Sequence, residues 1–173
     1  MILRCTIDGI SYENTVNSDK PLNSILFEVC PEFCINNNCL HNECGNCIVL
    51  LNGNPVLSCL VPAFKLKGAT IQTYAGFKKT RSYKDIEKAF ENHRTPCKQC
   101  IASKTLLIES LVNKMQKLNE FSARESSNIR TIPFEIIARE ISICKCQCME
   151  IEEISKIVSD TYTIRNQRRV RNA

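Results

Sequence analysis

The pattern of apolar and polar residues predicts strands and one helix at the start of the chain. Apolar and polar residues alternate over 2–7 and 10–16, which is typical of half-buried strands. The dipeptide Asp8-Gly9 between them is a strong signal for a two-residue hairpin turn. Over 21–30 the apolar residues recur at helical spacing after an initial proline. We therefore expect a hairpin followed by a short helix.

Three further strands are expected before residue 77. A short apolar run over 48–51 and a second run near 55–58 are separated by an Asn-Gly turn, so they predict another hairpin. The run over 69–74 predicts a last strand, closed by Gly76. Residues 59–66 predict a short second helix that ends at Gly68, so this half of the chain combines short strands and tight turns with two short helices.

The second half has helical periodicity and no strand signal. Basic residues over 77–82 indicate a linker, with Ser82 as an expected helix cap, and polar residues over 119–131 indicate a loop. The arginine-rich end, 163–173, is expected to be a disordered tail. Apolar spacing predicts four helices, over 83–93, 98–118, 133–142 and 149–162. We expect two domains, over 1–76 and 77–162.

Twelve cysteines in 173 residues require an explanation. Disulfides are one possibility, but the first residues meet a charge at Arg4 and show no secretory leader, and no apolar run approaches transmembrane length. Thiolates that bind metal in a reducing cytoplasm are the preferred interpretation.

The first cysteine group has a specific spacing. Cys39, Cys44, Cys47 and Cys59 follow C-x4-C-x2-C-x11-C, and the first three match the run of plant-type [2Fe–2S] ferredoxins. Gly45 supplies a small residue where backbone N–H groups must reach the sulfurs. Two hairpins, one helix and this loop together predict a β-grasp plant-type ferredoxin domain.

A second cysteine group lies in the helical half. Cys97 and Cys100 precede or open the long predicted helix, and Cys144 and Cys146 lie between the last two. Four thiolates in two pairs can hold a second iron–sulfur cluster or a tetrahedral zinc ion. The spacing alone leaves both metals open.

The order of these motifs makes the chain resemble the small iron–sulfur subunits of the molybdenum hydroxylases. This family includes xanthine dehydrogenase, carbon monoxide dehydrogenase and aldehyde oxidoreductase. The resemblance covers about residues 1–160. It is carried by the runs Cys39 to Cys47, Ser58-Cys59-Leu60, Gly68 to Thr73, Cys97 to Cys100 and Cys144 to Cys146.

The resemblance implies an α+β chain with two [2Fe–2S] clusters, the second in an all-α four-helix domain. Such a subunit relays single electrons between two partners, a flavin-binding subunit that holds FAD and a large molybdopterin-binding subunit. Family order implies that Cys144 and Cys146 complete the second ligand set, although Cys148 leaves the register ambiguous. The family's glutamine before the second group is Pro96 here, and its usual arginine is Lys145.

The remaining residues suggest no catalytic site. The five glycines form no nucleotide-binding fingerprint, and no carboxylate pair or nucleophile with its base stands out. A net charge of +5 with interleaved acids and no tryptophan argues against a nucleic-acid partner. We therefore expect a cytoplasmic electron-relay subunit of an oxidoreductase without a membrane partner. The alternatives are a free-standing ferredoxin-like carrier and a zinc-binding adaptor.

Overall fold

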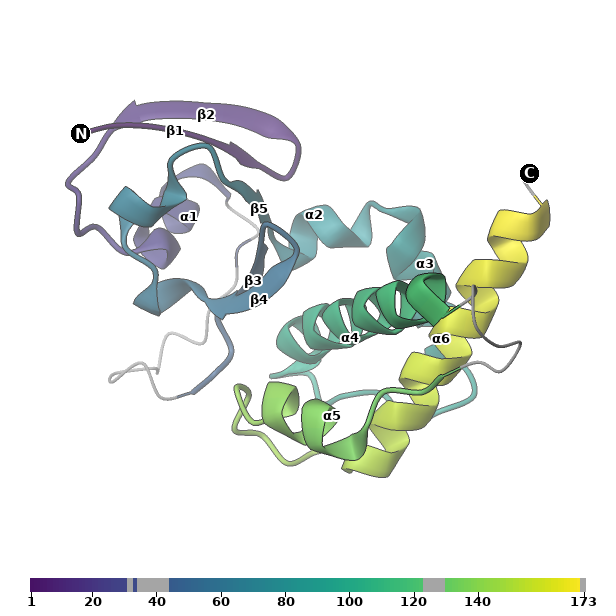
Figure 1. Ribbon diagram of the computed structural model, residues 1–173. Helices are drawn as coiled ribbons and strands as arrows, with labels where there is room; N and C mark the ends of the chain where they lie inside the picture. Colours follow the sequence, from purple (N-terminus) through teal and green to yellow (C-terminus); the bar gives the residue numbers. More distant parts are fainter. Residues whose placement is uncertain (31–32, 34–43, 123–129, 172–173) are drawn as a thin grey trace.

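The computed structural model describes residues 1–30, 33, 44–122 and 130–171, and it is a mixed α+β fold as predicted (Figure 1). The strands are β1 (Ile2–Ile7), β2 (Ile10–Thr15), β3 (Ile48–Leu51), β4 (Asn54–Leu57) and β5 (Thr70–Gln72). The helices are α1 (Leu22–Val29), α2 (Tyr74–Lys78), α3 (Arg81–Phe90), α4 (Ile101–Ser122), α5 (Phe134–Ile141) and α6 (Ile151–Arg171), with 3-10 turns η1 (Ser58–Leu60) and η2 (Ala63–Leu66).

The five strands form one sheet in the order β2-β1-β5-β3-β4. β1 and β5 are parallel, and every other neighbouring pair is antiparallel. Both predicted hairpin turns are present. Asp8 and Gly9 have φ of 50° and 83°, and Asn52 and Gly53 have φ of 50° and 80°. Positive φ at both central residues is the geometry of the tight hairpin turn that Asp-Gly and Asn-Gly favour.

β3 joins two hydrophobic cores because its side chains alternate between the two faces of the sheet. Val49 belongs to a core that contains Leu22, Ile25 and Leu26 of α1. Its neighbours Ile48 and Leu50 belong instead to the core of the helical half. The sheet therefore has α1 on one face and the helices on the other, an arrangement that Figure 1 shows.

α4 is the central helix of the second half. It contacts α2, α3, α5 and α6 as well as β3 and β4, and all its residues from 103 to 112 are buried. Because α4 is surrounded on all sides over this stretch, its polar residues there are buried along with its apolar ones, and the helix does not have one apolar and one polar face. The four predicted helices correspond to α3, α4, α5 and α6. α4 extends to Ser122, into the predicted loop, whose residues 123–129 lie outside the described part of the chain.

The predicted linker over 77–82 is not a linker in the structure. It spans the end of α2 and the start of α3, and Phe77 is 1% exposed. Its ring meets the ring of Tyr83 edge to face, with the centroids 5.9 Å apart. The expected cap Ser82 lies inside α3, and the Thr80 hydroxyl accepts the Tyr83 N–H at 3.2 Å instead. Burial of Phe77 thus overrides the basic, loop-like composition.

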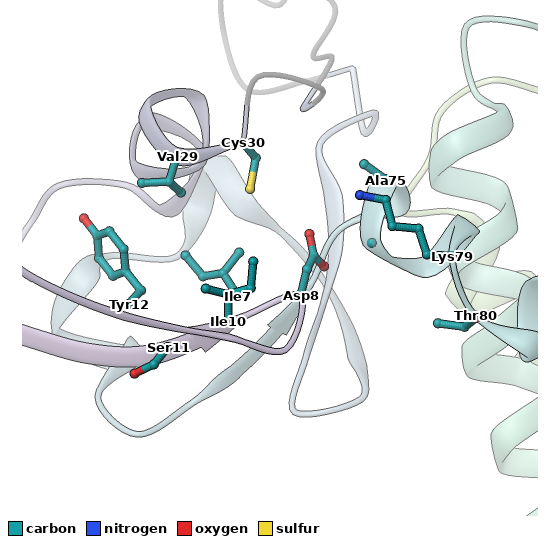
Figure 2. A pocket seen from close by; sticks show the side chains of 11 residues that line it. Ile7, Asp8, Ile10, Ser11, Tyr12, Val29, Cys30, Ala75, Lys79 and Thr80 are labelled. Carbon is teal, nitrogen blue, oxygen red and sulfur yellow. The ribbon is translucent and has the colours of Figure 1, made fainter.

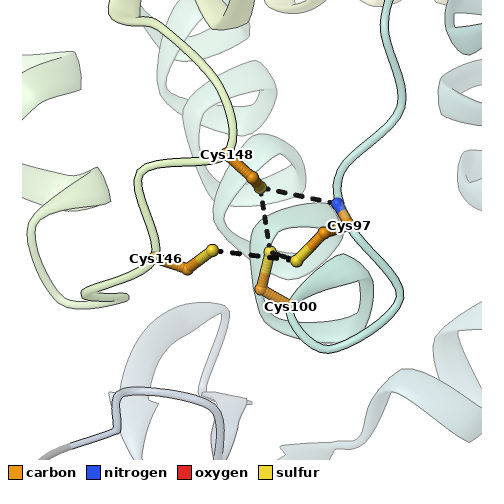
Figure 3. A group of neighbouring side chains, drawn as sticks. All are labelled: Cys97, Cys100, Cys146 and Cys148. Carbon is orange, nitrogen blue, oxygen red and sulfur yellow. Dashed lines mark hydrogen bonds between the residues drawn. The ribbon is translucent and has the colours of Figure 1, made fainter.

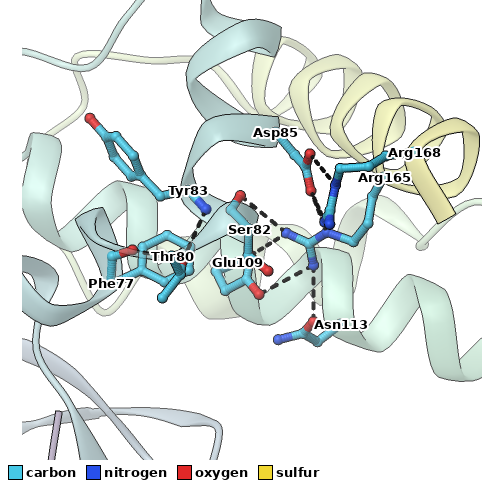
Figure 4. Close-up of polar contacts among 9 residues, drawn as sticks. All are labelled: Phe77, Thr80, Ser82, Tyr83, Asp85, Glu109, Asn113, Arg165 and Arg168. Atoms are coloured by element: carbon cyan, nitrogen blue, oxygen red, sulfur yellow. Dashed lines mark hydrogen bonds and ion pairs between the residues drawn. The ribbon is translucent and has the colours of Figure 1, made fainter. Parts of the chain in front are cut away.

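The predicted disordered tail also differs from the structure, because α6 continues as a helix through Arg171. A buried arginine explains the difference (Figure 4). The Arg165 guanidinium donates to Glu109 at 2.7 Å and to Asp85 at 3.3 Å, and it also reaches Asn113 of α4. Arg168 pairs with the same Asp85 carboxylate at 2.7 Å. These bonds attach the end of α6 to α3 and α4.

The Arg165 network predicts a large stability effect from one substitution. Arg165→Met should lower the free energy of unfolding by about 3–5 kcal/mol, because it leaves the buried Glu109 carboxylate without its cation. Arg169→Met is the matched control, since Arg169 is 52% exposed and lies 4.0 Å from Glu120. Its effect should stay below about 1 kcal/mol. Chemical denaturation measures both, and equal effects would contradict the structural role given to Arg165.

Candidate metal centres

Three of the four cysteines predicted for the first group lie in the described part of the chain. Cys47 precedes β3, and Cys59 lies in η1 directly after β4, so the β3–β4 hairpin brings them together. Their sulfurs are 3.4 Å apart. Cys44 lies at the start of the same described segment, and Cys39 lies outside the described residues. The hairpin thus explains how ligands 12 residues apart can share one site.

Local hydrogen bonds hold this group in place. Ser58 donates both its backbone N–H and its hydroxyl to the Cys47 carbonyl, at 3.0 and 2.8 Å. The Asn46 N–H points to the Cys44 sulfur at 3.4 Å. An N–H donor on a sulfur stabilises negative charge there, which suits a thiolate that binds metal.

Gly45 connects the first cysteine group to the helical half. Its φ is +69°, and a Cβ placed there would lie 2.1 Å from the Ile143 carbonyl oxygen and 2.8 Å from the Cys144 Cα. The neighbouring Asn46 amide oxygen also accepts from the Cys144 thiol at 3.5 Å. The backbone between Cys44 and Cys47 therefore packs directly on the segment after α5, which no larger residue would allow.

The second cysteine group consists of Cys97, Cys100, Cys146 and Cys148, whose sulfurs all lie within 4.8 Å of one another (Figure 3). Cys97 and Cys100 come from the turn that opens α4, and the other pair comes from the loop between α5 and α6. The sulfur of Cys97 is 3.1 Å from that of Cys100 and 3.7 Å from that of Cys146. Four soft sulfur donors from two segments are a ligand set that could hold a metal ion.

Burial and hydrogen bonding shift the pKa values of these thiols in opposite directions. The pKa of Cys97 is lowered to about 7, mainly because the Cys100 thiol donates a hydrogen bond to its sulfur. Burial raises the pKa of Cys100 well above its ordinary value, and burial also raises that of Cys146. Cys97 therefore loses its proton more readily than Cys100 or Cys146, and a bound cation would favour the thiolate form of its ligands.

In the structure, Cys148 and not Cys144 lies with Cys97, Cys100 and Cys146. The family order implies Cys144 as the fourth member. The Cys148 sulfur lies 3.1 Å from that of Cys100 and accepts the Cys97 N–H at 3.4 Å. Cys144 is buried and directs its thiol toward Asn46 instead. The pairs Cys144-x-Cys146 and Cys146-x-Cys148 have identical spacing, so the sequence contains both registers and no local signal separates them.

The second group lies at the edge of the fold. Lys98 and Gln99, between its first two cysteines, are at least partly exposed, and Lys145, which precedes Cys146, is also solvent-accessible. Cys100 itself is fully buried. A site with one buried and one solvent-facing side can exchange electrons with a neighbouring protein while the fold excludes bulk water from its inner side.

Two of the remaining cysteines occupy other surroundings. Cys5 packs in the core beside α1, where burial raises its pKa, as expected of a core thiol. Cys30 follows α1 and lines a cavity of about 650 Å³ between the β1–β2 hairpin and α2 (Figure 2). The charged groups among the described residues that line this cavity are Asp8 and Lys79, and Thr73 donates two hydrogen bonds to the Asp8 carboxylate. Cys34 lies outside the described residues.

The Gly45 contact gives a specific prediction. Gly45→Ala should disrupt the packing of the first cysteine loop on the Ile143–Cys144 segment, because the new Cβ collides with a backbone oxygen. We expect a loss of stability of roughly 2–4 kcal/mol from strain and displacement together. The matched control is Gly53→Ala, which has a similar φ of +80° but nothing within 4 Å of its Cβ. Its cost should be about 1 kcal/mol. Thermal unfolding compares them, and equal losses would show that the contact is not tight.

No helix among the described residues is long and apolar enough to cross a membrane. No family model matches the chain.

Comparison with curated proteins finds components of dehydrogenases. The chain is 27% identical over 132 residues to the 6-hydroxypseudooxynicotine dehydrogenase complex subunit beta of Paenarthrobacter nicotinovorans, covering 74% of this chain and 72% of that one. It is 24% identical to the xanthine dehydrogenase iron–sulfur-binding subunit of Escherichia coli O157:H7, with 83% and 93% covered. One of the subunits of nicotinate dehydrogenase from Pseudomonas putida is 24% identical, with 88% of both chains covered.

Solved structures share the fold. Quinoline 2-oxidoreductase from Pseudomonas putida 86 matches with a TM-score of 0.68 and 22% identity, over 98% of this chain and 96% of that one. The aldehyde oxidoreductase from Desulfovibrio desulfuricans matches with a TM-score of 0.69 and 14% identity. This chain spans 17% of that longer polypeptide.

The named relatives agree with the resemblance that the cysteine motifs indicate. They are subunits of dehydrogenases, and one of them is named as an iron–sulfur-binding subunit. The chain is thus similar over most of its length to subunits of dehydrogenases, one of them an iron–sulfur-binding subunit, and it shares its fold with two oxidoreductases of known structure.

Proposed function

We propose that this chain relays single electrons through two [2Fe–2S] clusters within a molybdenum hydroxylase complex. The observation that carries the proposal is that one chain builds two separate groups of thiols, joined by a direct backbone contact. A cluster with cysteine ligands accepts and releases one electron at a time when bound. Two such centres in series can divide the two-electron oxidation of a substrate into single-electron transfers.

The first cluster would be held by Cys39, Cys44, Cys47 and Cys59. The close approach of the Cys47 and Cys59 sulfurs and the N–H donor on Cys44 support this set. The strand order of the sheet, in which β5 lies between the two hairpins and runs parallel to β1, supports a β-grasp ferredoxin unit over about residues 1–76.

The second cluster would be held by Cys97, Cys100, Cys146 and Cys148. All four sulfurs already meet, and they provide the two pairs of thiolates that a binuclear cluster requires. This set differs from the family-order set in its last member. Cys144 would then be a buried thiol between the two centres, in contact with the first cysteine loop.

The contact at Gly45 provides a short route between the two centres. Gly45 lies between two ligands of the first group and packs on Ile143 and Cys144. From Cys144 the covalent chain reaches Cys146 through Lys145 alone. Electrons passing between the centres would cross one tight van der Waals contact and otherwise follow bonded atoms.

Electrons would enter and leave through other chains. The solvent-accessible residues Lys98, Gln99 and Lys145 surround the outer side of the second site. They stand where, by resemblance, the family faces its large molybdopterin-binding subunit, and the electrons would pass on to a flavin-binding subunit. We place the assembly in the cytoplasm, where thiols stay reduced. Native co-purification of a larger chain distinguishes this assembly from a free-standing carrier.

One observation favours a second candidate, a zinc ion at the second site. Tetrahedral zinc with bonds of about 2.3 Å separates its sulfurs by roughly 3.8 Å. Three of the sulfur–sulfur distances are 3.1 to 3.7 Å, close to that value, and all four sulfurs lie within 4.8 Å of one another. A binuclear cluster would require the four sulfurs to spread further apart. The chain would then be a structural adaptor at this end and an electron carrier at the other.

The metal content of the protein tests the proposal directly. Anaerobically purified protein should contain about four irons and about four acid-labile sulfides per chain, as two binuclear clusters imply. Its reduced form should show two paramagnetic resonance signals. Stoichiometric zinc with about two irons would instead support the adaptor at the second site, and zinc without labile sulfide would contradict the whole proposal.

The two registers of the second site are separated by a pair of substitutions. Cys148→Ser should abolish one of the two resonance signals, because it removes a sulfur that contacts Cys100. Cys144→Ser is the matched control and should keep both signals, since its thiol contacts Asn46. If Cys144→Ser abolished one signal and Cys148→Ser kept both, the family-order ligands Cys144 and Cys146 would be supported instead. Loss of both signals in a folded protein would show that the two centres are not independent.

A further inference from the structure

A lysine is buried one helical turn from the second cysteine group. Lys104 lies near the start of α4, and the whole residue is 1% exposed. Its side-chain nitrogen has no hydrogen-bond partner among the described residues. Taking an ammonium ion out of water without a partner is costly, so a native protein rarely keeps one unless something else compensates for the charge.

Every other buried charged residue in the described part of the chain has an oppositely charged partner. Asp85 and Glu109 pair with Arg165. Glu140 pairs with Lys114. The protein carboxylates in this core are therefore already engaged by other cations. Lys104 is the exception among the buried charges of the described residues.

Lys104 lies at the end of α4 that adjoins the second cysteine group. Its N–H donates to the Cys100 carbonyl at 2.8 Å, so the two residues are one turn apart on the same side of the helix. Long side chains on a helix lean toward its N-terminus. With this preferred lean, the Lys104 stem would extend along α4 toward the turn that holds Cys97 and Cys100.

The second metal centre would supply the missing negative charge. Two ferric ions, two sulfides and four thiolates sum to −2, and one added electron, which converts one ferric ion to ferrous, makes the sum −3. We propose that Lys104 is the buried counter-charge of the second centre and raises its reduction potential. This inference rests on the proposed function, because it takes the four cysteines to hold a cluster.

The physical reason is the low dielectric constant around α4. A positive charge one turn from the ligands attracts the reduced state, with its extra negative charge, more strongly than the oxidised state. It also attracts the metal-bound state more strongly than the empty one. Lys104 should therefore affect both the potential of one cluster and the retention of its metal.

Redox titration of the loaded protein tests the inference. Lys104→Met, which keeps most of the side-chain length and removes the charge, should shift the midpoint potential of one cluster to a more negative value and leave the other unchanged. Thr105→Val is the matched control. Thr105 is also buried on α4, its hydroxyl has no partner within the described part of the chain, and the change removes no charge. The control should shift neither potential.

A second measurement does not depend on redox activity. In the metal-free protein, Lys104→Met should raise the unfolding temperature, because an uncompensated buried ammonium is gone. In the loaded protein, the same change should speed the loss of metal to a chelator. Unchanged potentials together with unchanged metal loss would overturn the inference. An equal shift from Thr105→Val would also overturn it, since packing and not charge would then be responsible.

The outcomes also separate this inference from the proposed function. Four thiolates around one zinc ion likewise carry a charge of −2. If the second site held zinc, the proposed second cluster would be wrong, yet faster zinc loss from Lys104→Met would still support the counter-charge. If the site held a cluster, and Lys104→Met changed neither its midpoint potential nor its rate of metal loss, the proposed function would stand and the inference would fail.

Discussion

The contact of Gly45 with the backbone of Ile143 and Cys144 is the constraint on which the rest of this protein depends. It brings the loop of the first cysteine group against the segment that leads into the second. A side chain at position 45 would occupy the space that the Ile143 carbonyl fills. Because β3 also contributes Ile48 and Leu50 to the helical core, the loop and the strand after it are fixed to the helices together. The two groups of thiols therefore keep one spacing.

Much of the fold could be predicted from local signals in the sequence. The Asp8-Gly9 and Asn52-Gly53 turns both adopt the backbone geometry that their residues favour, and the longest helix follows from apolar spacing. The linker and the tail could not be predicted, since both depend on distant partners. Phe77 is buried against the helices, and Arg165 finds Asp85 and Glu109, which lie 80 and 56 residues earlier in the chain. Tertiary burial decides such segments, and local composition does not reveal it.

The cysteine groups show the same limit. The spacing of the cysteines predicted which segments supply the second group. Two cysteines that are two or three residues apart stay close in any local conformation of the turn or loop that holds them. Spacing could not choose between Cys144 and Cys148, since both lie two residues from Cys146. The choice is made by the packing of the α5–α6 loop, which directs the Cys144 thiol to Asn46 and the Cys148 sulfur to Cys100. The burial of Lys104 and Glu109 could not be predicted from the sequence either, because it depends on the elements that surround α4 in the fold.

We propose that one chain holds two iron centres with separate ligand sets. Anomalous X-ray scattering at the iron edge, from crystals of the anaerobically loaded protein, measures this most directly. The account predicts two pairs of iron atoms, one beside Cys44, Cys47 and Cys59 and the other among Cys97, Cys100, Cys146 and Cys148. A single iron site, or one metal atom without a second iron in the helical half, would contradict it.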